Sequence, residues 1–394
     1  MPPGRPAPRV IVVGGGIIGC ACADELARRG ASVTLVERAE LAAGASGRNH
    51  GLLLSPLDPD LVPMARASAA AYDELAEDTR LPFHLDRDPI GFLLVAGKDE
   101  AERAAGKEEA EAAARCAVAV DHLDADGVRG LEPGLATDLA EGWLLEDARR
   151  LDPGALTVAL ALRARRAGVE VRTGLPVRAL LSEEDNVRGV VTDEGTIEGD
   201  LVVLAAGPWS SSLLRALGAT VPITGARGWL VHLAPQRPPV SRLVGRAGWH
   251  APPNTEPAPP TTASQVVDGP PEADTGTLLQ PNADGTLLVG GSRQAVVTAE
   301  PEDPTVPRRL VREAIRLAPA LAQAPALGAW WGIRPMTPDG RPVVGMVRPG
   351  LMVASGHGSL GVILAAGTGR LVACLAMDDE PPFDPGPFEP ARFG

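Results

Sequence analysis

The stretch RVIVVGGGIIGCACADELARRGASVTLVE, residues 9–37, decides how this chain folds. It begins with an apolar run at 10–13, which predicts a buried strand, and a helix-period segment then extends to Gly30. A second apolar run ends in Glu37. Between the first strand and the helix stand three glycines in the order G-x-G-x-x-G: Gly14, Gly16 and Gly19. This order is typical of a strand–turn–helix–strand unit that binds a dinucleotide.

Each glycine of the motif has its own physical task. The first makes the tight turn, the second lets the backbone approach a pyrophosphate, and the third lets the helix pack on the strand. The N-terminus of the helix then faces the phosphates with the positive end of its dipole. Ile17 and Ile18 begin this helix, so we include them in the predicted site. A glycine-rich turn without a ligand is the alternative. It is disfavoured because strand, helix, second strand and terminal acid occur together.

The acid that ends the unit indicates which dinucleotide binds. Glu37 lies 18 positions after Gly19, where an acid hydrogen-bonds a ribose hydroxyl. A carboxylate at this position repels a 2′-phosphate, so the sequence disfavours NADP. Arg38 follows directly and belongs to the same predicted site.

Length and composition bound the remaining choices. A chain of 394 residues with 45% hydrophobic residues suits a globular protein of two domains. Its formal net charge of −13 disfavours nucleic acid and anionic membranes as partners. We find no apolar run of the roughly 20 residues that a membrane span needs, and residues 1–9 lack the apolar stretch of a signal peptide. Four cysteines, at 20, 22, 116 and 374, show no metal-ligand spacing, so we predict no metal site and a reducing cytoplasm as the location.

Beyond residue 37 the chain alternates between α/β passages and strand-rich inserts. The predicted helices are 61–79, 99–115, 155–166, 306–317 and 362–376, and the predicted strands are 91–96, 169–171, 177–181, 187–192, 196–198, 201–206, 228–233, 277–280, 286–290 and 351–354. Residues 251–275 hold seven prolines, which exclude a central strand or a helix. This stretch predicts a mobile insertion or lid.

Four separated segments resemble the D-amino-acid oxidase, glycine oxidase and sarcosine oxidase superfamily of flavoproteins. They are the unit at 9–37, GASGRNHG at 44–51, LVVLAAGPWS at 201–210, and WGIRPMTPDGRPVVG at 331–345 together with SGHGSLGVILAAGTGRLVA at 355–373. The last block is similar to the closing signature of that superfamily and is the most specific of the four. With the intervening pieces, the resemblance covers nearly the whole chain.

The resemblance implies an α/β fold with a discontinuous Rossmann-type FAD-binding domain and a smaller α+β substrate domain on an antiparallel sheet. The FAD-binding domain would comprise 1–80, 140–220 and 328–394, and the substrate domain 81–139 and 221–327. Besides the residues of the first unit, the resemblance implies FAD contacts from Ala45, Ser46, Arg48, Asn49, His50, Gly51, Val177, Ala206, Gly207, Trp209, Arg334, Gly356, His357, Gly358, Ser359, Leu360 and Gly361.

Three of these residues are also the predicted catalytic ones. In the superfamily, an arginine in the G-x-R-P context of Arg334 forks onto the substrate carboxylate, because its planar donors match two carboxylate oxygens. The alternative is a structural arginine paired with Asp339. The resemblance places His357 near the pyrimidine end of the flavin. His50 either faces the flavin ring as a polar pocket residue or is a buried neutral histidine.

The substrate side is less well defined. Two features differ from better-known relatives, which use tyrosines to hold the carboxylate and, in several sarcosine-type oxidases, a lysine to speed the reaction with oxygen. Here Tyr72 is the only tyrosine, in a helix expected to be remote from the motifs, and the two lysines, Lys98 and Lys107, lie on another segment. Weaker candidates for the substrate side are Arg227, Trp229, His232, Trp249, His250 and Arg293.

The resemblance predicts FAD-dependent oxidation of a C–N bond in an amino acid or amine, giving an imine. Three alternatives stay open: a dehydrogenase that uses an acceptor other than oxygen, a tailoring oxidase for a larger biosynthetic amine, and a flavin-binding subunit that needs a partner. The downstream flavin-type motifs disfavour an NAD-dependent dehydrogenase. The expected ligand is a small amine or amino acid, and a homo-oligomer is compatible with the sequence.

Overall fold

A computed structural model describes residues 7–85, 88–248, 274–296 and 305–393. The predicted proline-rich insertion at 251–275 lies outside these residues, apart from its last two positions, which begin a strand. Trp249 and His250 also lie outside them.

The first sheet carries the fingerprint unit. Its strands are β1 (Arg9–Val13), β2 (Ser32–Val36), β8 (Glu170–Arg172), β12 (Leu201–Leu204), β18 (Val343–Arg348) and β19 (Leu351–Ser355). Their order is β18-β19-β12-β1-β2-β8, and every pairing is parallel except that of β18 with β19. The carboxyl ends of the parallel strands therefore share one edge, and the direction of strand order reverses beside β1. Ligands of such sheets bind at this reversal.

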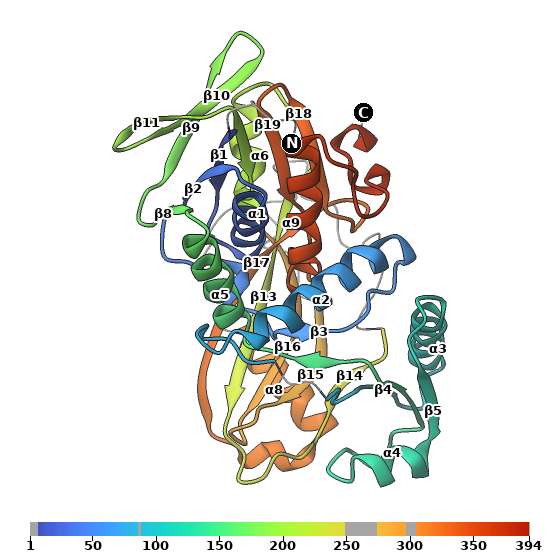
Figure 1. The fold of residues 1–394 in the computed structure, drawn as a ribbon. Coiled ribbons are helices and arrows are strands. Elements are labelled where there is room, and N and C mark those ends of the chain that lie inside the picture. The colour runs from blue at the N-terminus through green and yellow to red at the C-terminus, as the bar shows by residue number, and fades with distance from the viewer. Residues whose placement is uncertain (1–6, 86–87, 249–273, 297–304, 394) are drawn as a thin grey trace, which may run out of the picture.

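Both faces of this sheet are covered, which explains why its strands are apolar at successive positions. Helices cover one face: α1 (Ile17–Arg28), α5 (Pro153–Arg166) and α9 (Gly361–Met377) (Figure 1). A three-stranded sheet covers the other: β9 (Val177–Glu183), β10 (Asn186–Thr192) and β11 (Gly195–Glu198). Along β1, Val10 and Val12 belong to the helix-side core, whereas Ile11 and Val13 belong to the core shared with the small sheet. The predicted buried strand is confirmed.

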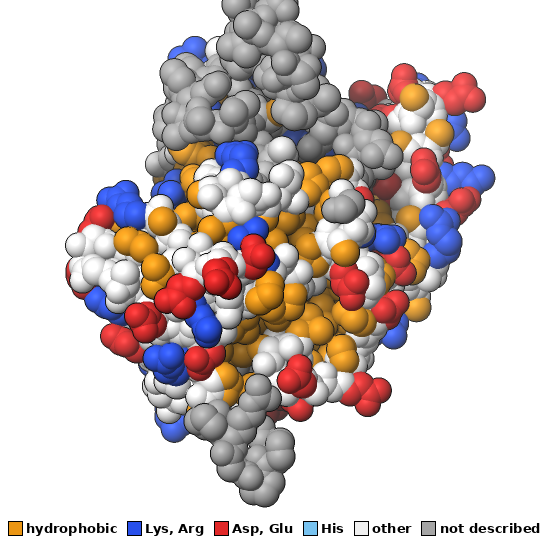
Figure 2. Space-filling model, turned by 90° about the horizontal axis from the view of Figure 1, so that it is seen from above, with side chains coloured by type: hydrophobic (Ala, Val, Ile, Leu, Met, Phe, Trp, Pro, Cys, Tyr) orange, Lys and Arg blue, Asp and Glu red, His pale blue; other side chains and the backbone are white. Residues whose placement is uncertain are grey.

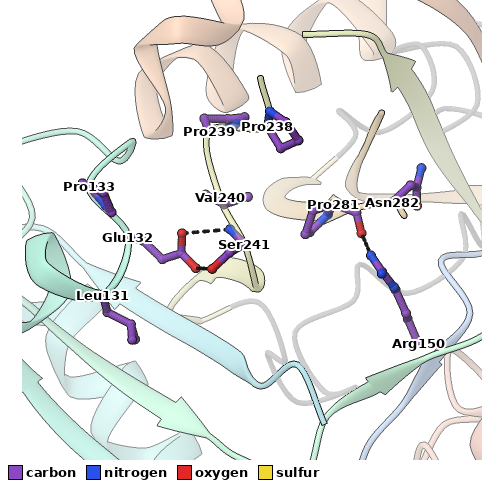
Figure 3. Close-up of a pocket in the computed structure, with 10 residues that line it drawn as sticks. All are labelled: Leu131, Glu132, Pro133, Arg150, Pro238, Pro239, Val240, Ser241, Pro281 and Asn282. Atoms are coloured by element: carbon purple, nitrogen blue, oxygen red, sulfur yellow. Dashed lines mark hydrogen bonds between the residues drawn. The ribbon is translucent and has the colours of Figure 1, made fainter. Parts of the chain in front are cut away.

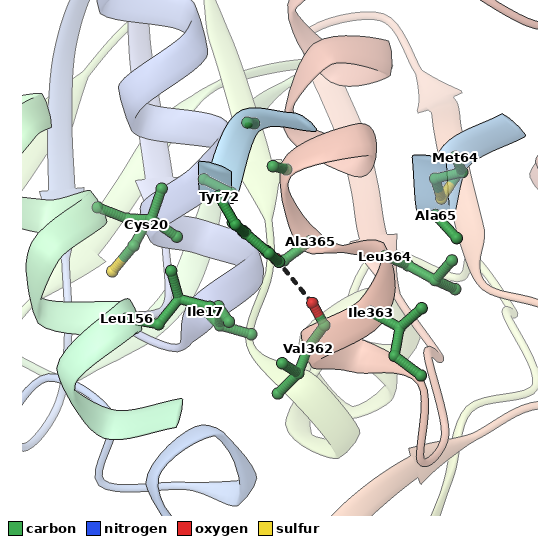
Figure 4. Packing of buried hydrophobic residues seen from close by; sticks show 14 of the residues in the cluster. Ile17, Cys20, Met64, Ala65, Tyr72, Leu156, Val362, Ile363, Leu364 and Ala365 are labelled. Atoms are coloured by element: carbon green, nitrogen blue, oxygen red, sulfur yellow. Dashed lines mark hydrogen bonds between the residues drawn. The ribbon is translucent and has the colours of Figure 1, made fainter. Parts of the chain in front are cut away.

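The structure corrects the prediction for Tyr72. This residue lies in α2 (Val62–Glu77), is fully buried, and donates a hydrogen bond of 2.7 Å from its hydroxyl to the Val362 carbonyl oxygen near the start of α9 (Figure 4). Far from being remote from the motifs, it packs on the helix that follows the 355–361 loop. Sequence distance misled the prediction, because α2 and α9 are almost 300 residues apart in the chain yet adjacent in space.

The second sheet is larger and mostly antiparallel. In spatial order its strands are β17 (Ala326–Met336), β13 (Thr224–Leu233), β16 (Leu287–Val296), β15 (Asp274–Pro281), β14 (Leu243–Arg246), β4 (Phe92–Ala96), β6 (Glu141–Leu145) and β5 (Val120–Asp124). Helix α8 (Thr305–Leu317) covers one face, where Trp229 and Val231 of β13 join its core. The opposite face, which we call the inner face, carries Gly228, Leu230, Gln280, Gly290 and Arg334.

The remaining elements connect or flank the two sheets. They are the short pair β3 (Leu52–Leu53) and β7 (Arg149–Arg150), the helices α3 (Glu100–Arg115) and α4 (Ala125–Leu131) beside β5 and β6, and α6 (Ser210–Arg215) after β12. Two strands qualify the domain boundaries drawn from the sequence. β6 begins after the boundary at 139–140 but pairs with β4 and β5, and β17 crosses the boundary at 327–328. The division into two domains stays a proposal.

One face of the molecule carries charges of both signs. Figure 2 shows acidic and basic side chains interspersed on the face seen from above, with apolar side chains between them. None of the helices in the described part of the chain has the length and apolar character that crossing a membrane requires.

Candidate functional site

The turn between β1 and α1 is packed so closely that only glycine fits. Gly14 has φ of +120°, and a Cβ there would lie 2.4 Å from the Ala205 carbonyl oxygen at the end of β12. A Cβ on Gly19 would lie 1.9 Å from the Gly14 carbonyl oxygen. The contact of Gly14 with Ala205 packs the turn against the carboxyl edge of the sheet, and the contact of Gly19 with Gly14 packs the start of α1 against the turn. Both are the tasks that the fingerprint assigns to these glycines.

Polar side chains from two other segments hold this turn. One carboxylate oxygen of Glu37 accepts a hydrogen bond of 2.6 Å from the Gly15 N–H, and the other accepts one of 2.8 Å from the Ala39 N–H. The Ser46 hydroxyl accepts a bond of 2.9 Å from the Ile17 N–H in the first turn of α1. Glu37 thus lies at the end of β2 directly over the glycine turn, where it can reach the ribose of a dinucleotide.

Other residues predicted to contact the cofactor also meet at this edge. The Arg38 guanidinium lies 3.8 Å from the centre of the Trp209 ring. Trp209 ends the short 3₁₀ helix Gly207–Trp209 that follows β12 and Ala206. The Leu175 N–H donates to the Glu37 carbonyl oxygen at 2.9 Å, which brings the start of β9 and its Val177 alongside.

The loop at 45–51 is shaped by one side chain. The Asn49 amide donates to the carbonyl oxygens of Ala45 and Ser46, and its own oxygen accepts from the Gly51 N–H at 2.8 Å. Gly51 has φ of +71°, and a Cβ there would lie 2.0 Å from the Leu151 carbonyl oxygen. The loop is therefore locked from within and fixed against β7.

The same loop lies against β17 of the second sheet. Arg48 donates to the Trp331 carbonyl oxygen at 3.3 Å. A Cβ on Gly332 would lie 3.3 Å from Arg48 Cβ and 3.4 Å from Ala45 Cα. Residues 44–51 and 331–337, which are nearly 300 positions apart, therefore form one junction between the two sheets.

The 355–361 loop closes the same edge. The Ser355 hydroxyl donates to the Gly207 carbonyl oxygen at 3.0 Å, and the Gly358 N–H donates to the Pro335 carbonyl oxygen at 2.8 Å. Helix α9 then begins at Gly361 without a side-chain cap on its N-terminus. Uncapped first-turn amides carry partial positive charge. The turn between β19 and α9 is completed by Gly356, Ser359 and Leu360.

His357 points into the helix packing. It is 1% exposed, and its Nε2 lies 2.9 Å from the Thr368 hydroxyl, which donates onward to the Leu364 carbonyl oxygen at 2.9 Å. Nδ1 is buried and has no hydrogen-bond partner among the described residues. Burial lowers the pKa of His357 to about 3. The ring is neutral, so the amides at the start of α9, and not an imidazolium, supply the positive potential of this loop.

Arg334 lies on the inner face of the second sheet. It stands opposite Ala226 on β13, and a Cβ on Gly228 would lie 2.2 Å from its Nη1. The same nitrogen donates to the Ser292 carbonyl oxygen at 3.1 Å. Asp339, the alternative partner considered from the sequence, instead accepts a bond of 2.7 Å from Arg392. The Arg334–Asp339 pair is thus not the arrangement in the structure.

His50 reaches the inner face from the 45–51 loop. Its Nδ1 lies 3.0 Å from the Gln280 side-chain oxygen, and a Cβ on Gly290 would lie 2.2 Å from its Nε2. This Nε2 is buried and has no hydrogen-bond partner within the described chain. Burial lowers the pKa of His50 to about 4; the bond to Gln280 opposes this shift, and the charge of Arg334 adds to it. His50 and Arg334 therefore both lie on the inner face, His50 against Gly290 of β16 and Arg334 against Gly228 of the paired strand β13.

The sequence did not reveal four residues that build this face: Gly228, Gln280, Gly290 and Ser292. Two signals were present. Gln280 is a polar residue at the end of an apolar strand, TLLQ, and Gly290 belongs to a glycine pair inside a strand, which often marks a close approach. Neither signal indicates that these two residues contact His50, because His50 lies more than 200 residues away from both in the sequence.

A separate pocket of about 470 Å³ lies past the end of β15 (Figure 3). It is lined by Leu131, Glu132, Pro133, Arg150, Pro238, Pro239, Val240, Ser241, Pro281 and Asn282. The Glu132 carboxylate accepts from both the backbone N–H and the hydroxyl of Ser241, and Arg150 donates to the Pro281 carbonyl oxygen. Because these polar groups are engaged with one another, we place the functional site at the junction of the two sheets.

The residues at this junction fit FAD. The glycine turn, the acid over it and the N-terminus of α1 suit a pyrophosphate and its ribose, and the start of α9 offers a second set of amides at the same edge. The inner face adds Arg334 and the neutral ring of His50, which reaches this face from the 45–51 loop.

A family model described as FAD dependent oxidoreductase matches residues 9–375. The glycine oxidase of Pseudomonas aeruginosa is 29% identical over 395 residues, which cover 97% of this chain and 98% of that protein. The bifunctional protein ThiO/ThiG of Synechocystis is 30% identical over 98% of this chain, and the match spans 54% of its length. The crystal structure of glycine oxidase from Geobacillus kaustophilus matches with a TM-score of 0.82 at 27% identity, covering 97% of this chain and 98% of that one.

Proposed function

We propose that this chain, which belongs to the family of FAD-dependent oxidoreductases, oxidises a C–N bond of an amino acid or related amine to an imine. The relatives named glycine oxidase support this substrate class. The observation that carries the proposal is Arg334 on the inner face, which the His50 ring also reaches.

Arg334 would bind the substrate carboxylate. Its guanidinium rests over Gly228 and is fixed by the bond to the Ser292 carbonyl oxygen, so the side chain is oriented before a ligand arrives. A preorganised guanidinium loses less freedom on binding and can form two parallel bonds to a carboxylate. Such a clamp would hold the carbon that bears the nitrogen in a fixed position, which is the main requirement for hydride transfer.

The glycine turn, Glu37, Ser46 and the loop at 355–361 would hold FAD, which when bound supplies the acceptor for the hydride. Arg38 and Trp209 would flank the adenine, next to the backbone of Val177. His357 would contribute by supporting α9 from within.

A dehydrogenase that uses an acceptor other than oxygen is the second candidate. The chain has only two lysines. Lys98 precedes α3, and Lys107 lies within α3 and pairs with Glu111 on the same helix at 3.9 Å. Since α3 packs beside β4, β5 and β6, neither lysine is placed to assist a reaction with oxygen at the sheet junction.

An anaerobic absorption experiment tests the proposal. The purified protein is reconstituted with FAD, and a panel of amino acids and secondary amines is added under nitrogen. We expect the flavin bands to bleach with at least one carboxylate-bearing amine, and admission of air then separates an oxidase from a dehydrogenase. If the bands persist with every amine, the proposed activity is wrong, and failure to take up FAD would contradict the cofactor.

We also propose a cytoplasmic location, since all four cysteines are buried free thiols, which suits a reducing compartment. Whether the chain works as a homo-oligomer is a further part of the proposal. Size-exclusion chromatography with light scattering tests it, because a monomeric mass at micromolar concentration would contradict it.

A further inference from the structure

We propose that Nε2 of His50, held as an acceptor by Gln280, receives a hydrogen bond from the N–H of the substrate amine. Gln280 is then a positioning residue for this contact. The inference rests on the proposed function, and it adds which chain atom meets the reacting nitrogen and which amines qualify as substrates.

The hydrogen bonds set the tautomer of His50. The Gln280 side-chain oxygen faces Nδ1 at 3.0 Å and can only accept, so Nδ1 carries the proton. Nε2 therefore presents a lone pair. With the ring neutral, because burial lowers its pKa to about 4, this nitrogen acts as an acceptor and not as a donor over the physiological pH range.

The position of Nε2 calls for a ligand. The atom is buried and has no donor within hydrogen-bond distance among the described residues. Buried polar atoms of folded proteins are almost always bonded, and leaving one unbonded destabilises the protein. The absence of a side chain at Gly290 lets the ring approach the sheet, since a Cβ there would lie 2.2 Å from Nε2. The strand is thus adapted to bring this nitrogen to the inner face.

The positive charge of Arg334 favours a ligand that carries a carboxylate. Arg334 is the charged group that acts on His50 from β17, while the facing positions on β13, β15 and β16 are Leu230, Gln280 and Gly290. A carboxylate bound at Arg334 cancels this positive charge. In an α-amino acid the nitrogen is separated from the carboxyl carbon by a single carbon. Arg334 rests against Gly228 of β13 and His50 against Gly290 of the paired strand β16, so the proposal places the amine of a substrate bound at Arg334 on the side of Nε2.

An acceptor is what the chemistry requires at this place. When bound, FAD would accept the hydride from the carbon that bears the nitrogen, and the nitrogen lone pair would form the C=N bond. A donor facing the nitrogen would occupy that lone pair. An acceptor bonded to N–H leaves it free, and the bond strengthens as positive charge develops on nitrogen, so it stabilises the transition state more than the bound substrate.

The proposal predicts a dependence on N–H. A neutral primary or secondary amine has an N–H to donate, whereas a neutral tertiary amine has none. The test uses the amino acid that bleaches the wild-type flavin fastest, together with its N-methyl and N,N-dimethyl derivatives. Flavin reduction is followed anaerobically by stopped-flow absorption in the wild type and in His50→Leu.

We expect His50→Leu to slow reduction by the primary and secondary amines by about tenfold or more, the scale of losing one hydrogen bond in a transition state. The rate of reduction by the tertiary amine is expected to change by less than about twofold. The rate difference between the tertiary amine and the other two amines should therefore be smaller in His50→Leu than in the wild type. If the tertiary amine instead stays slower by the same factor in both proteins, the extra methyl group acts through its size alone and the proposal is wrong.

A second measurement separates contact from structure. Acetate, which has a carboxylate but no amine, is titrated against both proteins through its perturbation of the flavin spectrum. We expect equal affinities within about twofold, because His50 does not contact the carboxylate. Loss of acetate binding in His50→Leu would show that the histidine only supports the fold of the pocket and would contradict the proposal.

The role of Gln280 has its own readout. In ¹⁵N-histidine-labelled protein, His50 is expected to show a protonated Nδ1 and a bare Nε2, with the resonance assigned from His50→Leu. Gln280→Leu should abolish this preference and the N–H dependence together, while Gln280→Glu, which keeps an acceptor, should retain both. A protonated Nε2 in the wild type would overturn the inference.

If no amine reduces the wild-type flavin at all, the proposed function fails, and this inference fails with it. If an amine reduces the wild-type flavin and His50→Leu reduces it at the same rate, this inference is wrong while the proposed function stands.

Discussion

The glycine turn and the inner face are built in opposite ways. In the turn, the Glu37 carboxylate and the Ser46 hydroxyl are bonded to backbone N–H groups of residues 15, 17 and 39. On the inner face, the Nε2 of His50 is buried with no hydrogen-bond partner in the described chain. A cofactor that stays bound suits a site whose shape is fixed by close backbone contact. A substrate that comes and goes suits a face with an acceptor ready for it.

The two regions also differ in how far apart their residues are in the sequence. The turn itself lies within 14–19, and its second strand follows within 20 residues. The inner face brings together His50, Gln280 and Arg334, each from a different part of the chain. Substitutions in the turn should therefore affect FAD binding, and substitutions on the inner face should affect the substrate while FAD stays bound.

The largest expected effect is that of Gly14→Ala. The new Cβ would lie 2.4 Å from the Ala205 carbonyl oxygen in a backbone with φ of +120°. We expect loss of most bound FAD and a destabilisation of about 3 kcal/mol, measured by the flavin-to-protein absorbance ratio and by urea unfolding. Gly130→Ala, inside α4 with no atom within 4 Å of the new Cβ, is the matched control. If Gly14→Ala binds FAD normally and has a normal free energy of unfolding, the close packing of the glycine turn does not control FAD binding.

The pH dependence of stability comes next. The pKa of His357 is lowered to about 3 in the folded protein, below its ordinary value of 6.5, so between these values the unfolded chain binds a proton that the folded chain does not. Its contribution to stability is therefore complete above pH 6.5 and is lost as the pH falls. We expect His357→Gln to reduce the slope of unfolding free energy against pH in this window by up to about 1.4 kcal/mol per unit.

Urea unfolding at several pH values between 4.5 and 7 measures this slope. His122→Gln, at an exposed ring on β5, is the control for loss of a histidine. Identical slopes for the wild type and His357→Gln would contradict the neutral, buried state of His357.

Arg334→Ala tests the inner face directly. We expect FAD to stay bound while the affinity for carboxylate-bearing amines falls by about tenfold or more, the scale of losing a charged bidentate bond. Amines without a carboxylate should be affected little. Arg341→Ala, in the same segment but paired with Asp58 at 2.7 Å, is the control. Unchanged kinetics with a carboxylate substrate would refute the assignment of Arg334.

The smallest effect is expected from Glu37→Gln. The amide keeps one acceptor oxygen, so it can replace only one of the bonds that the carboxylate accepts from the N–H groups of Gly15 and Ala39. We expect FAD affinity to fall by about fivefold, measured by titrating the apoprotein and following flavin fluorescence. The exposed Glu40→Gln is the control. If both variants bind FAD equally well, Glu37 does not reach the ribose.

The sequence predicted the local unit at 9–37 better than the contacts of the inner face. Val10–Val13, the glycine motif and Glu37 are consecutive parts of one local unit, and the structure confirms their arrangement. The prediction for Tyr72 was wrong because it judged remoteness by sequence, while the pairing of α2 with α9 depends on the fold. His357 was placed in the correct loop, but the bond to Thr368 that turns its ring into α9 could not be read from the motif.

By itself, the sequence determined the strand–turn–helix–strand unit with its terminal acid and the arginine in its G-x-R-P context, because these depend on residues close together in the chain. Only the tertiary structure decided what Arg334 and His50 face. Gly228 and Gly290 leave room on two paired strands, and Gln280 fixes one ring nitrogen, through contacts that span more than 100 residues. Such contacts follow from strand order and register, which a motif does not encode.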